Sequence, residues 1–170
     1  LDLSKIFPGS EKKLVYLDHH LSHTLTSLIY SEIRTGVCSI VIDGFGDRSS
    51  SSIHHVIDPY NIKELWNVEY PISIGLFYSA ITDFLGFAIN EGEYKVMGMA
   101  AYGDPIYEDQ VRQVLIPAED GSFSVDTSFV SYHYSATDSY TKKFGALFGE
   151  PRFPGSPFDP TTPEGKRYAD

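Results

Sequence analysis

The stretch VCSIVIDG, residues 37–44, is a near-continuous apolar run that ends in Asp-Gly. A short run of this kind is typical of a buried strand, so we predict a central strand whose C-terminal end presents Asp43. We predict that FGDRSSSS then forms a loop. Asp-Gly-x-Gly after a strand resembles turns that bind phosphate through backbone N–H groups, which makes Gly44 and Gly46 candidate phosphate-binding residues. A hairpin explains the same glycines about as well.

A helix is predicted before this strand. KLVYLD (13–18) has the pattern of a short buried strand, and Asp18 stands where a helix N-cap is expected. Between residues 19 and 33 the apolar residues follow the i, i+4, i+7, i+8 spacing of one helix face. They are Leu21, Leu25, Leu28 and Ile29. Gly36 is predicted to end this helix.

The remainder of the chain alternates between strand and helix patterns. SIHHVID and IKELWNVEYP indicate strands paired through the turn at 58–61, and VRQVLIP and SFSVD indicate short strands. Helices are predicted over 73–87 and within DSYTKKFGALFG, and EGKRYAD begins another. The segment NEGEYKVMGMAAYGDP (90–105) is predicted to form a Gly-bounded turn followed by a short helix. Prolines recur every third residue from 151 to 163, which indicates an extended surface segment. The order predicts an α/β fold with a mixed sheet and flanking helices.

Composition narrows the function classes. Thirteen basic residues against 23 acidic ones give a formal charge of -10 without a Lys/Arg cluster, which argues against nucleic-acid binding. Cys38 is the single cysteine, and a lone buried thiol favours a reducing compartment. No apolar run approaches the roughly 18 residues that a membrane span needs, and no signal-peptide pattern is recognisable. We therefore expect a cytoplasmic protein with neither nucleic-acid nor membrane partners.

Three histidines gather in YLDHHLSHTLTS, residues 16–27. His19 and His23 lie four residues apart, so on a helix both rings project from one face and suit one divalent ion. Asp43 is the candidate third ligand, because sites in α/β folds form where strand ends meet helix starts. His20 points about 100° away from the other two rings. The alternative is a helix start whose histidines are hydrogen-bonded in the core or on the surface.

Four segments, in order, resemble motifs of the NodU/CmcH-type carbamoyltransferases. They are DHHLSHTLTSLIYS, IVIDGFGD, YPISIGLFYSAITDFLGFAINEGEYKVMGMAAYGDP and PRFPGSPFDPTTPEGKRYAD. The most distinctive stretch is GEYKVMG followed by AYG. Two departures are Thr24-Leu25-Thr26, where the family is usually Ala-rich, and Asp47, where Glu is more usual. Neither removes a proposed ligand.

The resemblance implies an actin-like (ASKHA, ribonuclease H-like) domain. Residues 1–150 would form part of it, and 151–170 would be a Pro-rich extended segment and the start of a helix. In such proteins a YrdC-like domain makes carbamoyl-adenylate from carbamoyl phosphate and ATP. The actin-like domain then transfers the carbamoyl group to a hydroxyl of a small molecule, such as a secondary metabolite or nodulation factor. The second lobe and the YrdC-like domain are absent from this stretch, so we expect it to be inactive alone.

The resemblance also implies a ligand set. His19, His23 and Asp43 would hold an iron-type divalent ion, with a further aspartate from the second lobe; manganese and zinc also suit two histidines and one aspartate. Lys95 lies between glycines and is our own candidate for a positive charge near phosphate, with a solvated salt bridge to Glu93 as the alternative. His20 is a candidate acceptor of the proton from the attacking hydroxyl.

Two other functions stay open. The chain can be a metal-binding or structural α/β module without turnover. It can also be a relative of the hydrogenase-maturation carbamoyltransferases or of the tRNA threonylcarbamoyl enzymes, which use similar HxxxH sites. The GEYKVMG stretch favours the NodU-type branch.

Overall fold

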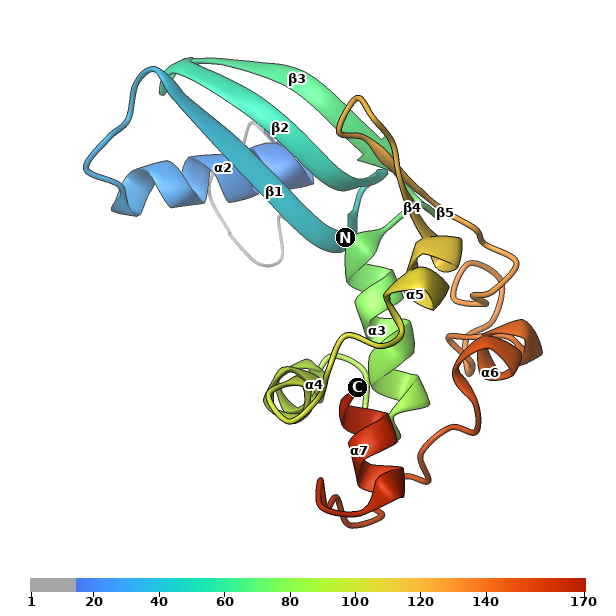
Figure 1. Cartoon of the computed structure of the whole chain (residues 1–170). Coiled ribbons are helices and arrows are strands. Elements are labelled where there is room, and N and C mark those ends of the chain that lie inside the picture. Colours follow the sequence, from blue (N-terminus) through green and yellow to red (C-terminus); the bar gives the residue numbers. More distant parts are fainter. Residues whose placement is uncertain (1–14) are drawn as a thin grey trace, which may run out of the picture.

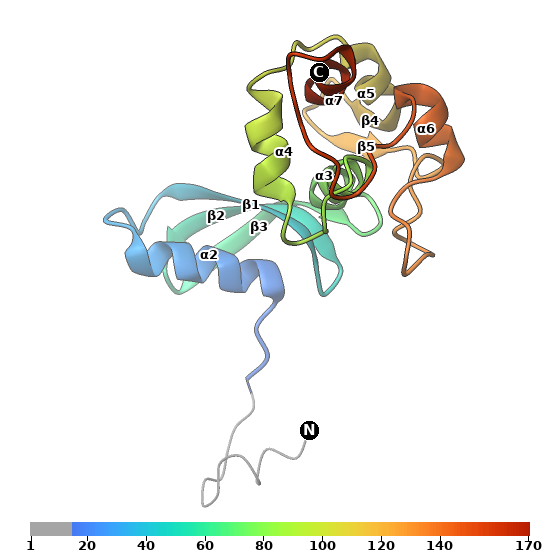
Figure 2. The same cartoon turned by 90° about the horizontal axis from the view of Figure 1, so that it is seen from below.

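The computed structural model describes residues 15–170 and has an α/β fold, as predicted. In chain order its elements are α2 (His19–Tyr30), β1 (Val37–Gly46), β2 (Ser49–Asp58), β3 (Asn61–Glu69), α3 (Ile74–Phe84), α4 (Glu93–Ala100), α5 (Glu108–Val114), β4 (Leu115–Pro117), β5 (Phe123–Val125), α6 (Lys142–Phe148) and α7 (Pro163–Ala169). Helix α2 lies against one face of a three-stranded sheet (Figures 1 and 2). The later helices gather with β4 and β5 beyond the end of β1 (Figure 1).

The three-stranded sheet has the order β1-β2-β3 with antiparallel pairing, and β4 pairs with β5 in the same sense. The described strands are thus antiparallel rather than mixed, and β2, not β1, is central. The predicted pairing of β2 with β3 through residues 58–61 is confirmed. Of the helices between residues 15 and 170, none combines the length and apolar character required to cross a membrane.

Strand β1 is covered on one face only. Val41 is buried, whereas Ile40 and Ile42 are 66% and 60% exposed and Cys38 is also exposed. The prediction of a buried thiol was therefore wrong. A continuous apolar run predicts a strand that is buried on both faces. Within residues 15–170, however, no element packs over Ile40 and Ile42.

Helix α2 begins as predicted, with the Asp18 carboxylate accepting a hydrogen bond of 2.9 Å from the Leu21 N–H. It ends at Tyr30, before Gly36, which lies at φ +65° in the connection to β1. The strand predicted over 13–18 falls partly outside the described residues. Residues 15–18 form no strand and are exposed, because no described segment pairs with them.

The serines at 49–52 were predicted to be a loop, but they form the buried start of β2. Hydrogen bonds to the hydroxyls of Ser49, Ser50 and Ser52 stabilise their burial. The buried Ser51 hydroxyl has no partner among the described residues. Ser50 Oγ donates to the Ile72 carbonyl at 2.5 Å, and Ser52 Oγ lies 2.8 Å from His20 Nδ1. The run of serines suggested a solvated loop from its composition. The hydrogen-bond partners of these hydroxyls come from distant parts of the chain, so the local sequence did not reveal the burial.

The second half packs around an aromatic core. Helix α3, predicted over 73–87, places Phe77 and Phe84 against Phe144 of α6. The segment VRQV was predicted as strand but is helix, with an ion pair of 2.8 Å between Glu108 and Arg112 one turn apart. Only LIP of that segment is the strand β4.

The proline-rich segment 151–163 lies on the surface, as predicted, and is attached to α3 through Arg152. Arg152 is buried; its guanidinium donates to the Leu85 carbonyl at 2.9 Å, and its backbone N–H donates to the Phe84 carbonyl at 3.0 Å. The segment then leads into α7, where Tyr168 packs against the core. The expected helix start after the prolines is thereby confirmed.

Glu93 closes the start of α4. Its carboxylate accepts hydrogen bonds from the N–H groups of Asn90 and Gly92 at 2.9 and 3.1 Å and from the Ser79 hydroxyl at 3.3 Å. Burial acts to raise the pKa of Glu93, but these bonds outweigh it and hold the pKa below the ordinary 4.5. The ionised form therefore stabilises the folded chain.

A pH dependence follows. The folded-state pKa of Glu93 is depressed below the ordinary 4.5, so ionised Glu93 stabilises the folded chain above pH 4.5. This stabilisation is lost as the pH falls from there through the folded-state pKa. We expect wild type to be more stable than Glu93→Gln at neutral pH, with the difference shrinking below pH 4.5. Urea unfolding of both proteins from pH 6 to pH 3 measures it. A difference that is constant across this range would contradict the prediction.

Candidate metal centre

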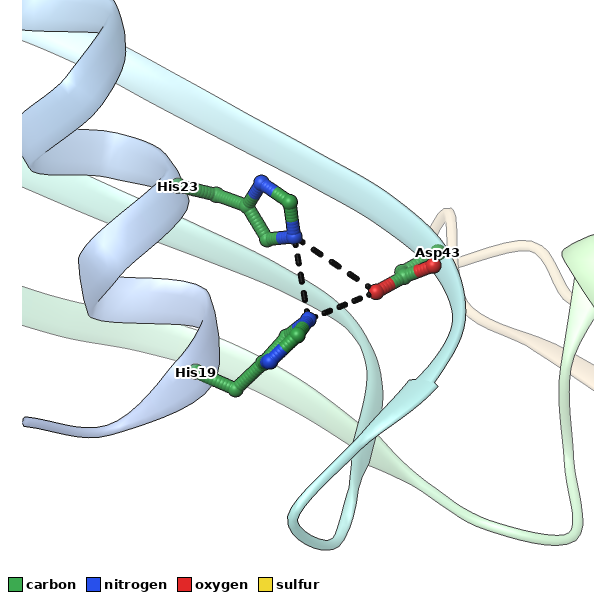
Figure 3. A group of neighbouring side chains, drawn as sticks. All are labelled: His19, His23 and Asp43. Atoms are coloured by element: carbon green, nitrogen blue, oxygen red, sulfur yellow. Dashed lines mark hydrogen bonds and ion pairs between the residues drawn. The ribbon is translucent and has the colours of Figure 1, made fainter.

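The three residues predicted as metal ligands converge in the structure. His19 and His23 project from α2 toward Asp43 at the end of β1 (Figure 3). The His19 Nε2 lies 2.9 Å from Asp43 Oδ2 and 3.0 Å from His23 Nε2, and the His23 Nε2 lies 3.5 Å from the same carboxylate oxygen. Within the described residues these three form a group whose ligand atoms all lie within 4.8 Å of one another.

The spacing of these atoms fits one bound cation. Nitrogen and oxygen ligands about 2.1 Å from one ion, at angles between octahedral and tetrahedral, lie roughly 3.0–3.4 Å apart. The three distances among the His19 Nε2, the His23 Nε2 and Asp43 Oδ2 are 2.9, 3.0 and 3.5 Å. Two facing Nε2 atoms share at most one proton when both rings are neutral, whereas a cation satisfies both nitrogens and the carboxylate together. The donor set therefore fits a divalent metal.

Asp43 is prepared for this role by its backbone surroundings. Its Oδ1 accepts a hydrogen bond of 2.6 Å from the Gly44 N–H, which leaves Oδ2 facing the histidines. Burial acts to raise the pKa of the Asp43 carboxyl, but the Gly44 N–H and His19 outweigh it, so the pKa is lowered. The carboxylate is thus ionised at neutral pH.

Helix α3 supports the back of Asp43. Ser73 caps this helix by accepting from the Leu76 N–H at 3.0 Å, and its hydroxyl donates to the Gly44 carbonyl at 2.6 Å. A Cβ at Gly75 would lie 2.5 Å from the Asp43 carbonyl oxygen, so only glycine lets the helix approach this closely. Ser73 and Gly75 were missed from the sequence. A serine before an apolar helix signals an N-cap, but it does not say which strand the helix meets.

His20 is placed differently from its neighbours. It is fully buried between α2 and the sheet, with Nδ1 2.8 Å from Ser52 Oγ. Its Nε2 has no hydrogen-bond partner within residues 15–170. Burial is the main cause of a lowered pKa for the ring, which is therefore neutral at neutral pH. The geometry supports a packing role under α2, and its role as a proton acceptor stays a prediction.

The three candidate phosphate-site residues differ in their surroundings. The Gly44 N–H is engaged by Asp43, and Gly46 faces the His19 ring. The Lys95 ammonium lies 5.6 Å from the ring centroid of Phe87 and 5.7 Å from that of Tyr94, on α4. In the described part of the chain it makes no ion pair with Glu93. Phosphate contacts by these three residues stay a prediction.

Comparison with known proteins identifies the family. Residues 1–156 match the family model described as Carbamoyltransferase N-terminus. The chain belongs to the carbamoyltransferase N-terminal family. The match covers more than half of the chain, including α2, β1 and the three proposed ligands.

Relatives of this carbamoyltransferase N-terminal chain include nodulation proteins. It is 34% identical over 154 residues to an uncharacterized protein of Synechocystis sp., covering 88% of this chain and 24% of the relative. It is 31% identical over 114 residues to nodulation protein NolNO of Sinorhizobium fredii, covering 66% and 16%, and 35% identical over 98 residues to nodulation protein NolO of Bradyrhizobium diazoefficiens, covering 58% and 17%. The chain thus spans a quarter or less of these relatives, and the NodU/CmcH-type resemblance is confirmed.

Proposed function

We propose that the protein containing this carbamoyltransferase N-terminal chain is an O-carbamoyltransferase whose metal centre includes His19, His23 and Asp43. The observation that carries the proposal is the convergence of three metal-ligating atoms within 4.8 Å on a chain of this family. Two imidazoles and one carboxylate leave coordination positions open on a divalent ion. The two histidine side chains are 43% and 52% exposed, so a substrate could reach an ion held between them.

The proposed ion is iron, with manganese and zinc as alternatives that suit the same ligands. When bound, a divalent ion supplies Lewis-acid stabilisation of negative charge on a phosphate or carbamoyl oxygen. The residues of this chain hold the ligand atoms in place. Neutral imidazoles present Nε2 lone pairs, and the ionised Asp43 offsets part of the cation's charge. A further aspartate from the second lobe is proposed to complete the ligand set.

The proposed substrates are carbamoyl phosphate, ATP and a small molecule with an acceptor hydroxyl. A YrdC-like domain elsewhere in the protein would hydrolyse carbamoyl phosphate with one water to carbamate and inorganic phosphate. The carbamate would then attack the α-phosphate of ATP to form carbamoyl-adenylate, with pyrophosphate as the leaving group. The carbamoyl group would then pass from the adenylate to the hydroxyl oxygen, with AMP as the leaving group and the hydroxyl proton lost to a base. The nodulation relatives favour an acceptor in secondary-metabolite or nodulation-factor biosynthesis.

The test uses the intact protein with carbamoyl phosphate and ATP. Consumption of both, with release of phosphate and pyrophosphate in equal amounts, is the expected result. The isolated chain should consume neither, because the remaining ligand and the adenylate-forming domain are proposed to lie elsewhere in the protein. An intact protein that binds metal but consumes neither compound would instead be a metal-binding module without turnover.

A further inference from the structure

The turn between β1 and β2 contacts His19 through two neighbouring residues, Gly46 and Asp47. Gly46 leaves room for the His19 imidazole, and Asp47 accepts a hydrogen bond from the His19 backbone N–H. The turn lies far from His19 in the sequence, and the two contacts fix the ring and the backbone of one residue independently. Among the described residues, His23 has no such glycine against its ring and no carboxylate at its backbone N–H.

Gly46 is the residue that leaves room for the ring. A Cβ built there would lie 2.6 Å from His19 Nε2 and would overlap Cγ and Cδ2 of the same ring. The φ angle of Gly46 is not in the left-handed region, so the backbone alone would accept alanine. Gly44 offers a matched comparison, because a Cβ there would meet Leu76 Cδ2 at an ordinary 3.5 Å. The need for glycine at position 46 therefore comes from the His19 imidazole.

Asp47 holds the backbone of His19. Its Oδ2 accepts a hydrogen bond of 2.9 Å from the His19 N–H, one of the N–H groups at a helix start that have no partner within the helix. Asp47 itself lies at φ +55°, a conformation that aspartate and asparagine adopt more readily than most residues. With Asp18 accepting from Leu21, the first turn of α2 is fixed from two sides.

We propose that the β1–β2 turn is a positioning element for the metal ligand His19, with Gly46 and Asp47 as its positioning residues. The proposal rests on the metal centre proposed above. Residues that orient a ligand typically change metal affinity about 10- to 100-fold when replaced. A methyl group at Gly46 would displace the His19 ring from its present position. Loss of the Asp47 carboxylate would release the backbone N–H of the same histidine.

The first experiment measures affinity for Fe²⁺ and Co²⁺ in the intact protein under anaerobic conditions. Gly46→Ala is expected to weaken binding about 10- to 100-fold. The control is Gly145→Ala on α6, where an added Cβ would meet no neighbouring atom within 4 Å, and it should bind like wild type. Asp47→Gly keeps the positive φ but lacks the acceptor, so it should weaken binding; Asp47→Asn keeps an acceptor oxygen and should restore it. Wild-type affinity in both Gly46→Ala and Asp47→Gly would overturn the proposal.

A second experiment tests the contact without metal. Gly46→Ala should lower the Tm of the metal-free protein in the wild-type background but not in a His19→Ala background, where the ring it would strike is gone. Equal losses of Tm in both backgrounds would overturn the inference. If the wild-type protein binds no metal, the proposed function fails. The dependence of the Gly46→Ala effect on His19 still shows whether the turn holds this histidine.

Discussion

Alanine at His19 or at His23 is expected to weaken divalent-metal binding by at least about 100-fold, and to abolish carbamoyl transfer with it. Each substitution removes one of three converging ligand atoms, a larger loss than replacement of a residue that only orients a ligand. Metal content and Fe²⁺ affinity of the intact protein measure the first effect. Formation of the carbamoylated acceptor from carbamoyl phosphate, ATP and acceptor measures the second.

His55→Ala is the matched control for these substitutions. His55 is an exposed histidine of β2 that lies outside the cluster, so the control should keep wild-type metal content and activity. Retained metal and retained activity in both His19→Ala and His23→Ala would mean that the cluster is structural. Loss of metal with unchanged activity would mean that these residues bind a metal that carbamoyl transfer does not require.

Phe144→Ala is expected to have the largest effect on stability, about 3–5 kcal/mol. The Phe144 side chain belongs to α6, is 1% exposed and packs against Phe77 and Phe84 of α3. Its ring centroid is 4.5 Å from that of Phe148 and 5.3 Å from that of Phe84. Truncation leaves a cavity that these neighbouring rings fill only in part. Urea unfolding of the intact protein measures the loss.

Phe153→Ala is the control for this core prediction. Phe153 is 79% exposed, so its truncation should change the unfolding free energy by less than about 0.5 kcal/mol. Similar losses for the two variants would mean that Phe144 is not the centre of the core. A large loss at Phe144 alone, with metal affinity unchanged, would show that the aromatic core and the metal centre are energetically separate.

The sequence by itself determined the parts of the site that depend on local patterns. The four-residue spacing of His19 and His23 places both rings on one helix face, and Asp18 supplies the N-cap that starts the helix. The apolar run before Asp43 indicates the strand that carries the carboxylate. Each of these follows from neighbouring residues, because helix and strand periodicities are properties of a few consecutive positions. The helices at 74–84 and 93–100 were predictable for the same reason.

Only the tertiary structure decided which residues face one another across the chain. The overlap of Gly46 with the His19 ring, the close approach of Gly75 to Asp43 and the partnership of His20 with Ser52 each join segments far apart in the sequence. Glycines that suggested a phosphate turn thus include one that makes room for a histidine, and serines that suggested a loop form a buried strand. The reason is physical: a local pattern determines a residue's backbone conformation, whereas space and hydrogen-bond partners at long range depend on how the elements pack.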